Sequence, residues 1–220
     1  MKCLESDRLK LRPIERADLT KLNTWKNSEE IYQNLGGGYM PVSIDTQEKW
    51  LDDLMDTTGK NKRFMIQLKG ADAIGMIGLY GINWIHRTCE LGVFIGESEQ
   101  HGKGLGSEAY RLIEEFAVRY LNLRKIKAFV VSDNDSAVHM YEKLGFGKVG
   151  ELKAERFING KYCSARAFFF SAMNLKPVKV SYIFTPLTSQ TLRAISVVTM
   201  VLRAVAFLGS LPARFLAPMT

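Results

Sequence analysis

Apolar residues recur at helical spacing in several segments of the chain. The clearest covers residues 105–120, where charged residues occupy the opposite face, a pattern that predicts an amphipathic helix. Residues 15–27 repeat apolar residues at steps of three and predict a second helix. Residues 45–55 predict a third, which we expect Asp45 to cap, because Glu48 follows at the spacing of a capping box.

Shorter apolar runs predict strands between and after these helices. We expect strands at residues 9–14, 64–68, 74–80, 89–95, 126–131, 146–157 and 162–170. Residues 69–72 and the pair Asn159 and Gly160 are typical of hairpin turns. A short helix over residues 136–144 is expected before the last hairpin, and Gly145 ends it.

This order of elements predicts an α+β fold with one central, mostly antiparallel sheet flanked by helices. The order is strand, two helices, three strands, helix, strand, helix and a final hairpin. No internal repeat interrupts it, and no boundary is visible before about residue 175. We therefore expect one domain over residues 1–175 and a separate C-terminal extension over residues 176–220.

Charge is distributed unevenly between these two parts. The 220 residues contain 30 Lys and Arg and 23 Asp and Glu, a net charge of +7. The extension holds five of the basic residues and no acid, so the first 175 residues carry 25 basic and 23 acidic residues, a net charge of +2. Because the body is nearly neutral and has no stripe of aromatic and basic residues, the sequence disfavours a nucleic-acid binder.

Within the extension, residues 190–208 predict an amphipathic helix that Ser189 caps and Gly209 ends. Its length of about 28 Å is close to that of a membrane span. Arg203 lies well inside it, however, and a central Arg costs about 2.5–3.5 kcal/mol on insertion. We expect a helix that contacts a membrane surface or another subunit of a homo-oligomer; the alternatives are a membrane span and an extension without a role.

Cysteine usage and the N-terminus favour the cytoplasm. Cys3, Cys89 and Cys163 are far apart and form no C-x-x-C pair, so we expect free thiols and no zinc site. His86 and His139 have no His, Cys or Asp partner at metal-ligand spacing, so no metal is expected. The first fifteen residues lack the apolar region of a secretory signal peptide.

A glycine-rich segment joins the strand at residues 89–95 to the strongest helix, and it consists of His101, Gly102, Lys103, Gly104, Leu105, Gly106 and Ser107. The first N–H groups of a helix have no partner within it, and glycines let a ligand approach the backbone. With the helix dipole, these groups form an anion site that suits a pyrophosphate, and Lys103 adds charge at its rim. The alternative is a tight turn that only links strand and helix.

A second group of residues surrounds the short helix. Asn134, Ala137, Tyr141, Lys143 and Gly145 are spaced so that Ala137 and Tyr141 share one helix face. A small residue beside a tyrosine leaves room for a ligand, and a tyrosine hydroxyl can act as a general acid. The alternative for Tyr141 is a core aromatic residue with its hydroxyl at the rim.

The two groups together resemble the motifs of the GNAT acetyltransferases. Residues 101–106 are similar to the Arg/Gln-x-x-Gly-x-Gly/Ala motif that binds the coenzyme A pyrophosphate in that family. Residues 134–146 match its Asn-x-x-Ala-x-x-x-Tyr-x-Lys-x-Gly-Phe block. The resemblance covers about residues 7–173. Residues 82–87 and 156–162 are most similar to the branch of spermidine acetyltransferases and ribosomal-protein N-terminal acetyltransferases.

The resemblance implies the GNAT fold and acetyl transfer from acetyl-CoA to a primary amine, with Tyr141 as the general acid. The residues it implies for binding the coenzyme are Val93, Phe94, Ile95, His101, Gly102, Lys103, Gly104, Leu105, Gly106, Ser107, Asn134, Ala137 and Lys143. The backbone of residues 93–95 would hold the pantetheine arm and supply an oxyanion donor, and Asn134 would form a hydrogen bond near the thioester.

Two residues of this site carry their own alternatives. His101 stands where the family motif has Arg or Gln, and a neutral imidazole would weaken coenzyme binding, increasingly so as pH rises; the alternative is a histidine that only faces solvent. Glu90, on the strand before the glycine-rich segment, is our candidate for the base that takes the amine proton. Its alternative is a carboxylate in a salt bridge, with a water chain as the base.

Acidic residues in the N-terminal helices favour a polyamine such as spermidine as the acceptor. They are Glu29, Glu30, Asp52, Asp53 and Asp56. The alternative is that these acids form solvated helix faces. Other acceptors to consider are protein N-termini and amino-sugar nucleotides. A rival of another class is a non-catalytic module that binds coenzyme A or a partner protein and docks through its tail.

Overall fold

A computed structural model of the chain describes residues 3–35 and 39–171. The predicted extension at residues 176–220, with its helix at residues 190–208, lies outside the described residues.

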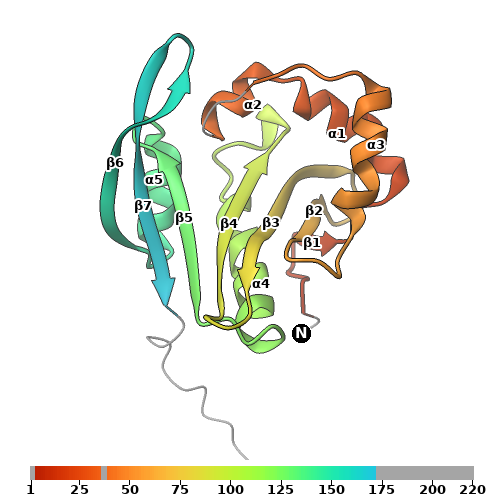
Figure 1. Ribbon diagram of the computed structural model, residues 1–220. Helices are drawn as coiled ribbons and strands as arrows, with labels where there is room; N and C mark the ends of the chain where they lie inside the picture. The colour runs from red at the N-terminus through yellow and green to blue at the C-terminus, as the bar shows by residue number, and fades with distance from the viewer. Residues whose placement is uncertain (1–2, 36–38, 172–220) are drawn as a thin grey trace, which may run out of the picture. The chain divides into compact units, whose positions relative to one another are not determined.

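Seven strands form one sheet in the order β1-β2-β3-β4-β5-β7-β6 (Figure 1). They are β1 (Leu9–Arg12), β2 (Lys62–Leu68), β3 (Ala73–Asn83), β4 (Thr88–Ile95), β5 (Lys125–Val131), β6 (Gly147–Ile158) and β7 (Lys161–Ser171). Every neighbouring pair is antiparallel except β4 and β5, which are parallel. This confirms the predicted α+β fold with a mostly antiparallel sheet, and each expected strand is present.

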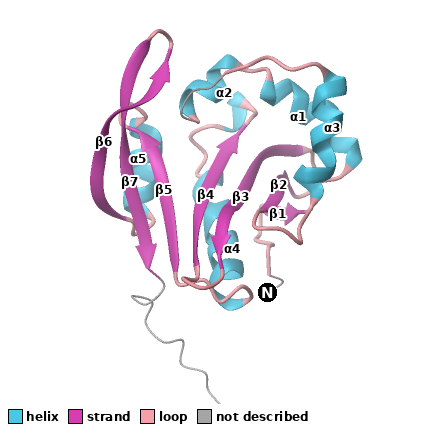
Figure 2. Cartoon of the chain, viewed as in Figure 1, coloured by secondary structure: helices cyan, strands magenta, loops and turns pink. Residues whose placement is uncertain are grey.

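Helices lie on both faces of the sheet (Figure 2). One face is covered by α4 (Leu105–Arg119) and α5 (Asp135–Lys143). The other face carries α1 (Leu19–Lys26), α2 (Glu29–Asn34) and α3 (Ile44–Met55). Short 3₁₀ turns precede α1 at Arg16–Asp18 and α4 at Ser98–Gln100.

The N-terminal helices differ from the prediction in their boundaries. Residues 15–27 divide into the 3₁₀ turn and α1, and the six-residue α2 was not expected. Asp45 is not the cap of α3. Ser43 has the extended backbone that a capping position requires, and its Oγ accepts a hydrogen bond from Thr46 N at 3.2 Å. Asp45 lies in the first turn of α3, where its negative charge interacts favourably with the helix dipole.

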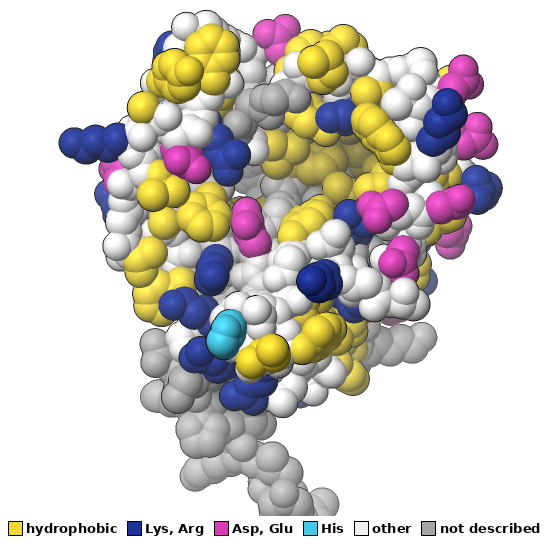
Figure 3. Space-filling view, in the orientation of Figure 1, with side chains coloured by type: hydrophobic (Ala, Val, Ile, Leu, Met, Phe, Trp, Pro, Cys, Tyr) yellow, Lys and Arg dark blue, Asp and Glu magenta, His cyan; other side chains and the backbone are white. Residues whose placement is uncertain are grey.

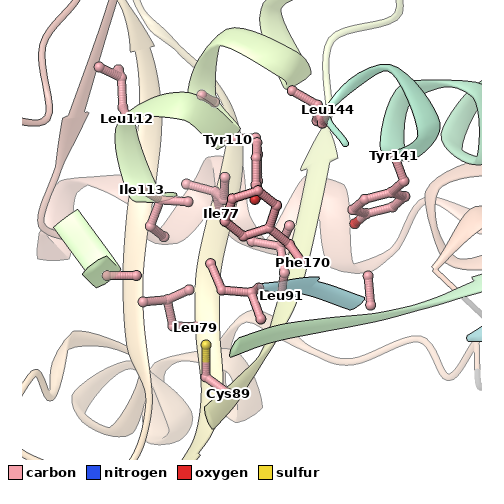
Figure 4. Packing of buried hydrophobic residues seen from close by; sticks show 14 of the residues in the cluster. Ile77, Leu79, Cys89, Leu91, Tyr110, Leu112, Ile113, Tyr141, Leu144 and Phe170 are labelled. Carbon is pink, nitrogen blue, oxygen red and sulfur yellow. The ribbon is translucent and has the colours of Figure 1, made fainter. Parts of the chain in front are cut away.

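The core has one part on each face of the sheet. Side chains of a strand alternate between faces, so Ile77 and Leu79 of β3 pack with Ile113 of α4 (Figure 4). Met76, which directly precedes Ile77, points to the other face and packs in the cluster that contains Trp25 of α1. The sheet therefore separates a large core under α4 and α5 from a smaller one under α1 and α3.

Candidate functional site

β4 and β5 are paired only at their beginning. Parallel pairing joins residues 88–90 to residues 125–127 and ends there, while β4 continues to Ile95 and β5 to Val131. Beyond Glu90 the two strands diverge (Figure 1). The second half of β4 therefore has an edge that no strand of the described residues covers.

Val93 and Ile95 form this open edge. Gly96 N donates to Ile74 O across the β3–β4 ladder at 2.7 Å, and the direction of backbone groups alternates along a strand. Phe94, which pairs with Met76, therefore directs its N–H and C=O to β3, whereas Val93 and Ile95 direct theirs to the open side. Three residues were expected to hold a pantetheine arm through the backbone. Val93 and Ile95 have backbone groups that point to the open edge, whereas those of Phe94 point to β3.

The glycine-rich segment lies at the N-terminus of α4. Gly102 and Gly104 have φ values of 73° and 75°, which other residues adopt at a cost, and Gly104 caps the helix. Glu108 N donates to Gly104 O at 3.1 Å, so the N–H groups of residues 105–107 precede the first helical hydrogen bond. Among the described residues these N–H groups have no hydrogen-bond partner, and N–H groups in that position can bind an anion.

Arg8 and Glu108 hold this segment in place. Arg8 Nε donates to Glu108 Oε2 at 2.7 Å, and Arg8 Nη1 donates to Lys103 O at 3.2 Å. Ser6 Oγ donates to Glu108 Oε1 at 2.6 Å. Burial raises the pKa of Glu108, but the hydrogen bonds from Ser6 and Arg8 outweigh it and hold that pKa below its ordinary value. Sequence reasoning missed this pair because its members are 100 residues apart.

His101 contacts the end of β4. Its Nε2 lies 2.9 Å from Ile95 O, and because a carbonyl oxygen only accepts, this nitrogen carries the ring proton. The side chain is otherwise exposed. One interpretation of the sequence is that His101 only faces solvent. The contact with Ile95 O shows that His101 also joins the glycine-rich segment to the open edge of β4.

The two predicted catalytic residues, Tyr141 and Glu90, lie on α5 and β4. Tyr141 (Figure 4) is only 5% exposed. Its ring lies edge-on to Phe146, with centroids 4.9 Å apart, and stacks on Phe168, with centroids 6.0 Å apart. Burial and the negative charge of Glu90 raise the pKa of Tyr141, so the phenol keeps its proton at neutral pH. Glu90 is exposed, and it lies opposite Lys127 of β5.

Residues of α5 take positions that their types explain. Asn134 caps the helix, because its Oδ1 accepts a hydrogen bond from Ala137 N at 3.0 Å. Any hydrogen bond of Asn134 to a thioester would therefore come from its Nδ2. Ala137 packs against the same core as Tyr141. Lys143 is exposed in the last turn of α5, where a positive charge interacts favourably with the helix dipole.

Three acids in α3 and at its C-cap have partners of their own. Asp52 pairs with Arg16 at 2.6 Å, and both side chains are exposed. Asp53 pairs with Arg63 at 3.2 Å. Asp56 accepts a hydrogen bond from Thr58 N at 2.7 Å. These three acids therefore match the alternative of solvated helix faces, and Glu90 is the carboxylate that lies beside the opening of the sheet.

A cavity that the sequence did not predict lies between α1–α3 and the sheet. Its volume is about 220 Å³, and Figure 3 shows a hollow on this face, lined mostly by hydrophobic side chains. The lining residues are Leu22, Trp25, Lys26, Tyr32, Gln47, Trp50, Leu54, Met76 and Phe94. Phe94 links this cavity to the open edge, because its side chain lines the cavity while Val93 and Ile95 flank it on β4.

No helix in residues 3–35 or 39–171 is long and apolar enough to cross a membrane. In the same residues, no group of three or more His, Cys, Asp or Glu side chains is arranged to hold a metal ion.

Known proteins resemble this chain in sequence and in structure. A family model described as an acetyltransferase (GNAT) domain matches residues 8–147. Spermidine N(1)-acetyltransferase from Escherichia coli K12 is 34% identical over 161 residues, which cover 71% of this chain and 82% of that protein. The protein of that name from Vibrio cholerae is 30% identical over 170 residues, which cover 74% of this chain and 93% of that protein.

Among solved structures, spermidine N-acetyltransferase from Vibrio cholerae in complex with CoA and spermine has a TM-score of 0.70 and 30% sequence identity. The match covers 76% of this chain and 96% of that one. A dodecameric structure of the Vibrio cholerae enzyme in an intermediate state has a TM-score of 0.63 at 30% identity, over 76% of this chain and 95% of that one.

Proposed function

The chain belongs to the GNAT acetyltransferase family, and from that premise we propose that it acetylates a primary amine of a spermidine-like polyamine. It is an acetyl-CoA-dependent N-acetyltransferase. The observation that supports a polyamine as the acceptor is the similarity to two spermidine N(1)-acetyltransferases, at 34% and 30% identity over most of their length.

The residues present fit acetyl-CoA as the co-substrate. The free N–H groups of residues 105–107 and the positive end of the α4 dipole suit its pyrophosphate. The backbone groups of Val93 and Ile95 on the open edge suit the amides of its pantetheine arm. When bound, acetyl-CoA supplies a thioester whose carbonyl carbon an amine can attack.

Glu90 removes the proton from the incoming ammonium, directly or through water. An alkyl ammonium has a pKa of about 10.4, so only about one molecule in 10³ is neutral at pH 7. A carboxylate that is exposed beside the opening of the sheet can accept this proton and attract a cationic acceptor.

Tyr141 holds the proton that the departing sulfur requires. Its Oη is protonated at neutral pH, as in any phenol of ordinary pKa, and burial raises that pKa further. Its ring is fixed by Phe146 and Phe168. A proton donor held in one orientation is what general acid catalysis needs. The N–H of Val93 or Ile95, on the open edge, stabilises charge on the carbonyl oxygen.

We also propose that the enzyme is a homo-oligomer in the cytoplasm. The dodecameric structure of the Vibrio cholerae relative supports assembly. The free Cys3, Cys89 and Cys163 support a reducing compartment.

The test is thiol release from acetyl-CoA with spermidine, an N-terminal peptide and an amino-sugar nucleotide as acceptors. We expect release with spermidine, and we expect Tyr141→Phe to lower kcat by about 10² or more while CoA affinity is retained. Tyr162→Phe is the matched control, since Tyr162 is 72% exposed on β7. Thiol release with only the N-terminal peptide or only the amino-sugar nucleotide would show that this compound, and not a polyamine, is the acceptor. CoA binding without release to any amine would establish a non-catalytic module.

A further inference from the structure

Trp25 of α1 packs against the end of β4. The residue is only 3% exposed, and its ring meets that of Phe94 edge-on, with centroids 5.7 Å apart. Its Nε1–H donates a hydrogen bond to Glu97 Oε1 at 3.3 Å. One side chain of α1 thus contacts β4 and its continuation on both sides of Ile95, a residue whose backbone groups point to the open edge.

Gly96 lies between these two contacts, directly against the indole. A Cβ built on Gly96 would lie 2.3 Å from Trp25 Nε1, 2.4 Å from Cε2 and 2.6 Å from Cδ1, whereas non-bonded heavy atoms prefer about 3.5–4.0 Å. The φ of Gly96 is not positive, so the approach of the indole, and not the backbone conformation, requires a glycine here. Trp25 therefore rests on the backbone of the residue that follows Ile95.

Lys21 joins α1 to the same place. It lies one turn before Trp25 on α1, and its Nζ donates to Ala73 O at 2.9 Å and lies 3.7 Å from Glu97 Oε1. Ala73 begins β3, the strand that pairs with β4. Glu97 thus interacts with two residues of α1, and it also takes the N-cap position of the turn at Ser98–Gln100, which leads to the glycine-rich segment.

The position of Ile95 affects two parts of the proposed coenzyme site. Its N–H points to the open edge, and its carbonyl oxygen lies 2.9 Å from His101 Nε2. His101 begins the glycine-rich segment, whose N–H groups at residues 105–107 precede the first helical hydrogen bond of α4. Hydrogen bonds weaken steeply when their geometry is distorted. A shift of Ile95 would therefore weaken binding both at the edge that suits the pantetheine arm and at the segment that suits the pyrophosphate.

From these contacts we propose that Trp25 is a positioning residue for coenzyme binding. It acts through Phe94, Gly96 and Glu97, and it holds Ile95 and the start of the glycine-rich segment in place. This inference rests on the acetyl-CoA binding of the proposed function, and it assigns to α1, on the face of the sheet that carries α1–α3, an effect on the coenzyme.

Calorimetric titration with CoA, beside urea unfolding without ligand, tests this role. Trp25→Phe keeps a ring beside Phe94 and removes the N–H donor, so we expect it to weaken CoA binding about three- to tenfold. Trp25→Leu also removes the aromatic contact and should weaken CoA binding about tenfold or more.

Phe64→Leu is the matched control for the loss of a buried aromatic contact. Phe64 is 6% exposed and meets Phe116 of α4 edge-on, with centroids 5.6 Å apart, in the core on the other face of the sheet. The variant should lower the urea midpoint, as Trp25→Leu does, and leave CoA affinity within about twofold. A difference in CoA affinity between the two variants therefore separates positioning from stability.

Variants of Glu97 isolate the hydrogen bond. Glu97→Gln keeps an oxygen that accepts from Trp25 Nε1 and should retain CoA affinity within about threefold, whereas Glu97→Ala should weaken CoA binding as Trp25→Phe does. Because both changes remove the same hydrogen bond, the double variant Trp25→Phe/Glu97→Ala should bind CoA about as well as the weaker single variant.

Three results would overturn the inference: unchanged CoA affinity in Trp25→Leu, an equal loss of CoA affinity in Phe64→Leu, or fully additive losses in the double variant. The proposed function fails separately. A chain that binds CoA and acetylates no amine would refute the proposed function and leave the role of Trp25 standing. If the unsubstituted chain does not bind CoA, both fail.

Discussion

Substitution of Gly104 by alanine tests the role of the glycine-rich segment most sharply. Gly104 caps α4 with φ at 75°, a left-handed conformation. A Cβ built there meets no atom within 4 Å, so alanine brings no clash. The effect of Gly104→Ala is therefore a backbone effect alone.

The expected size follows from that geometry. A residue with a Cβ pays about 1–2 kcal/mol for the left-handed conformation, so Gly104→Ala should lower the free energy of unfolding by about that amount. If the backbone relaxes instead, the N–H groups of residues 105–107 turn away from the anion site. Loss of one hydrogen bond to a charged ligand costs about 1.5–3 kcal/mol, which corresponds to a tenfold or greater loss of CoA affinity.

Gly147→Ala is the control for both measurements. A Cβ at Gly147 also meets no atom within 4 Å, and its φ is not positive, so alanine should be neutral or stabilise by about 0.4–1 kcal/mol. Urea unfolding without ligand measures stability, and calorimetric titration with CoA measures affinity. Equal stability and equal CoA affinity in the two variants would refute the assignment of the anion site to this helix N-terminus.

Three further predictions concern the core and its ionisable groups. Gly96→Ala should destabilise the fold by about 1–3 kcal/mol in urea unfolding, because its Cβ would lie 2.3 Å from Trp25 Nε1; an unchanged midpoint would contradict this packing. Burial raises the pKa of Asp18, but hydrogen bonds from Arg12 outweigh it and leave that pKa below its ordinary value. The ion pair thus stabilises the fold above the unfolded pKa and is lost as pH falls through the folded pKa, so urea midpoints measured downward from about pH 5 should fall more steeply than in Asp18→Asn. Burial raises the pKa of Cys89 to about 12, so iodoacetamide at about pH 8 should leave Cys89 unmodified in the native protein by peptide mapping; modification at the unfolded rate would refute its burial.

Elements whose signal is local were predictable from the sequence. α4 has an apolar stripe over four turns, and it is found at Leu105–Arg119, close to the predicted range. The turn at Asn159 and Gly160 has φ values of 48° and 77°, as the two-residue hairpin loop requires. Gly145, with φ at 84°, ends α5 as expected. In each case a few consecutive residues hold the whole signal.

Features that depend on distant residues were not predictable. α2 has six residues and none of them is buried, so no apolar period marks it. The cavity joins residues of α1, α2 and α3 to Met76 and Phe94 of two strands, which only the fold brings together. The open edge of β4 likewise follows from where its pairing with β5 ends, and the apolar run at residues 89–95 contains no sign of it.

Mass spectrometry of the product is the decisive test of acetyl transfer to a polyamine. The full chain is incubated with acetyl-CoA and spermidine, and the acetylated amine is quantified beside the released thiol. We expect acetylspermidine in an amount equal to the thiol, and loss of both products in Tyr141→Phe. Bound CoA with no acetylspermidine would rule out acetyl transfer to spermidine, and equal formation of acetylspermidine by Tyr141→Phe would rule out Tyr141 as the general acid.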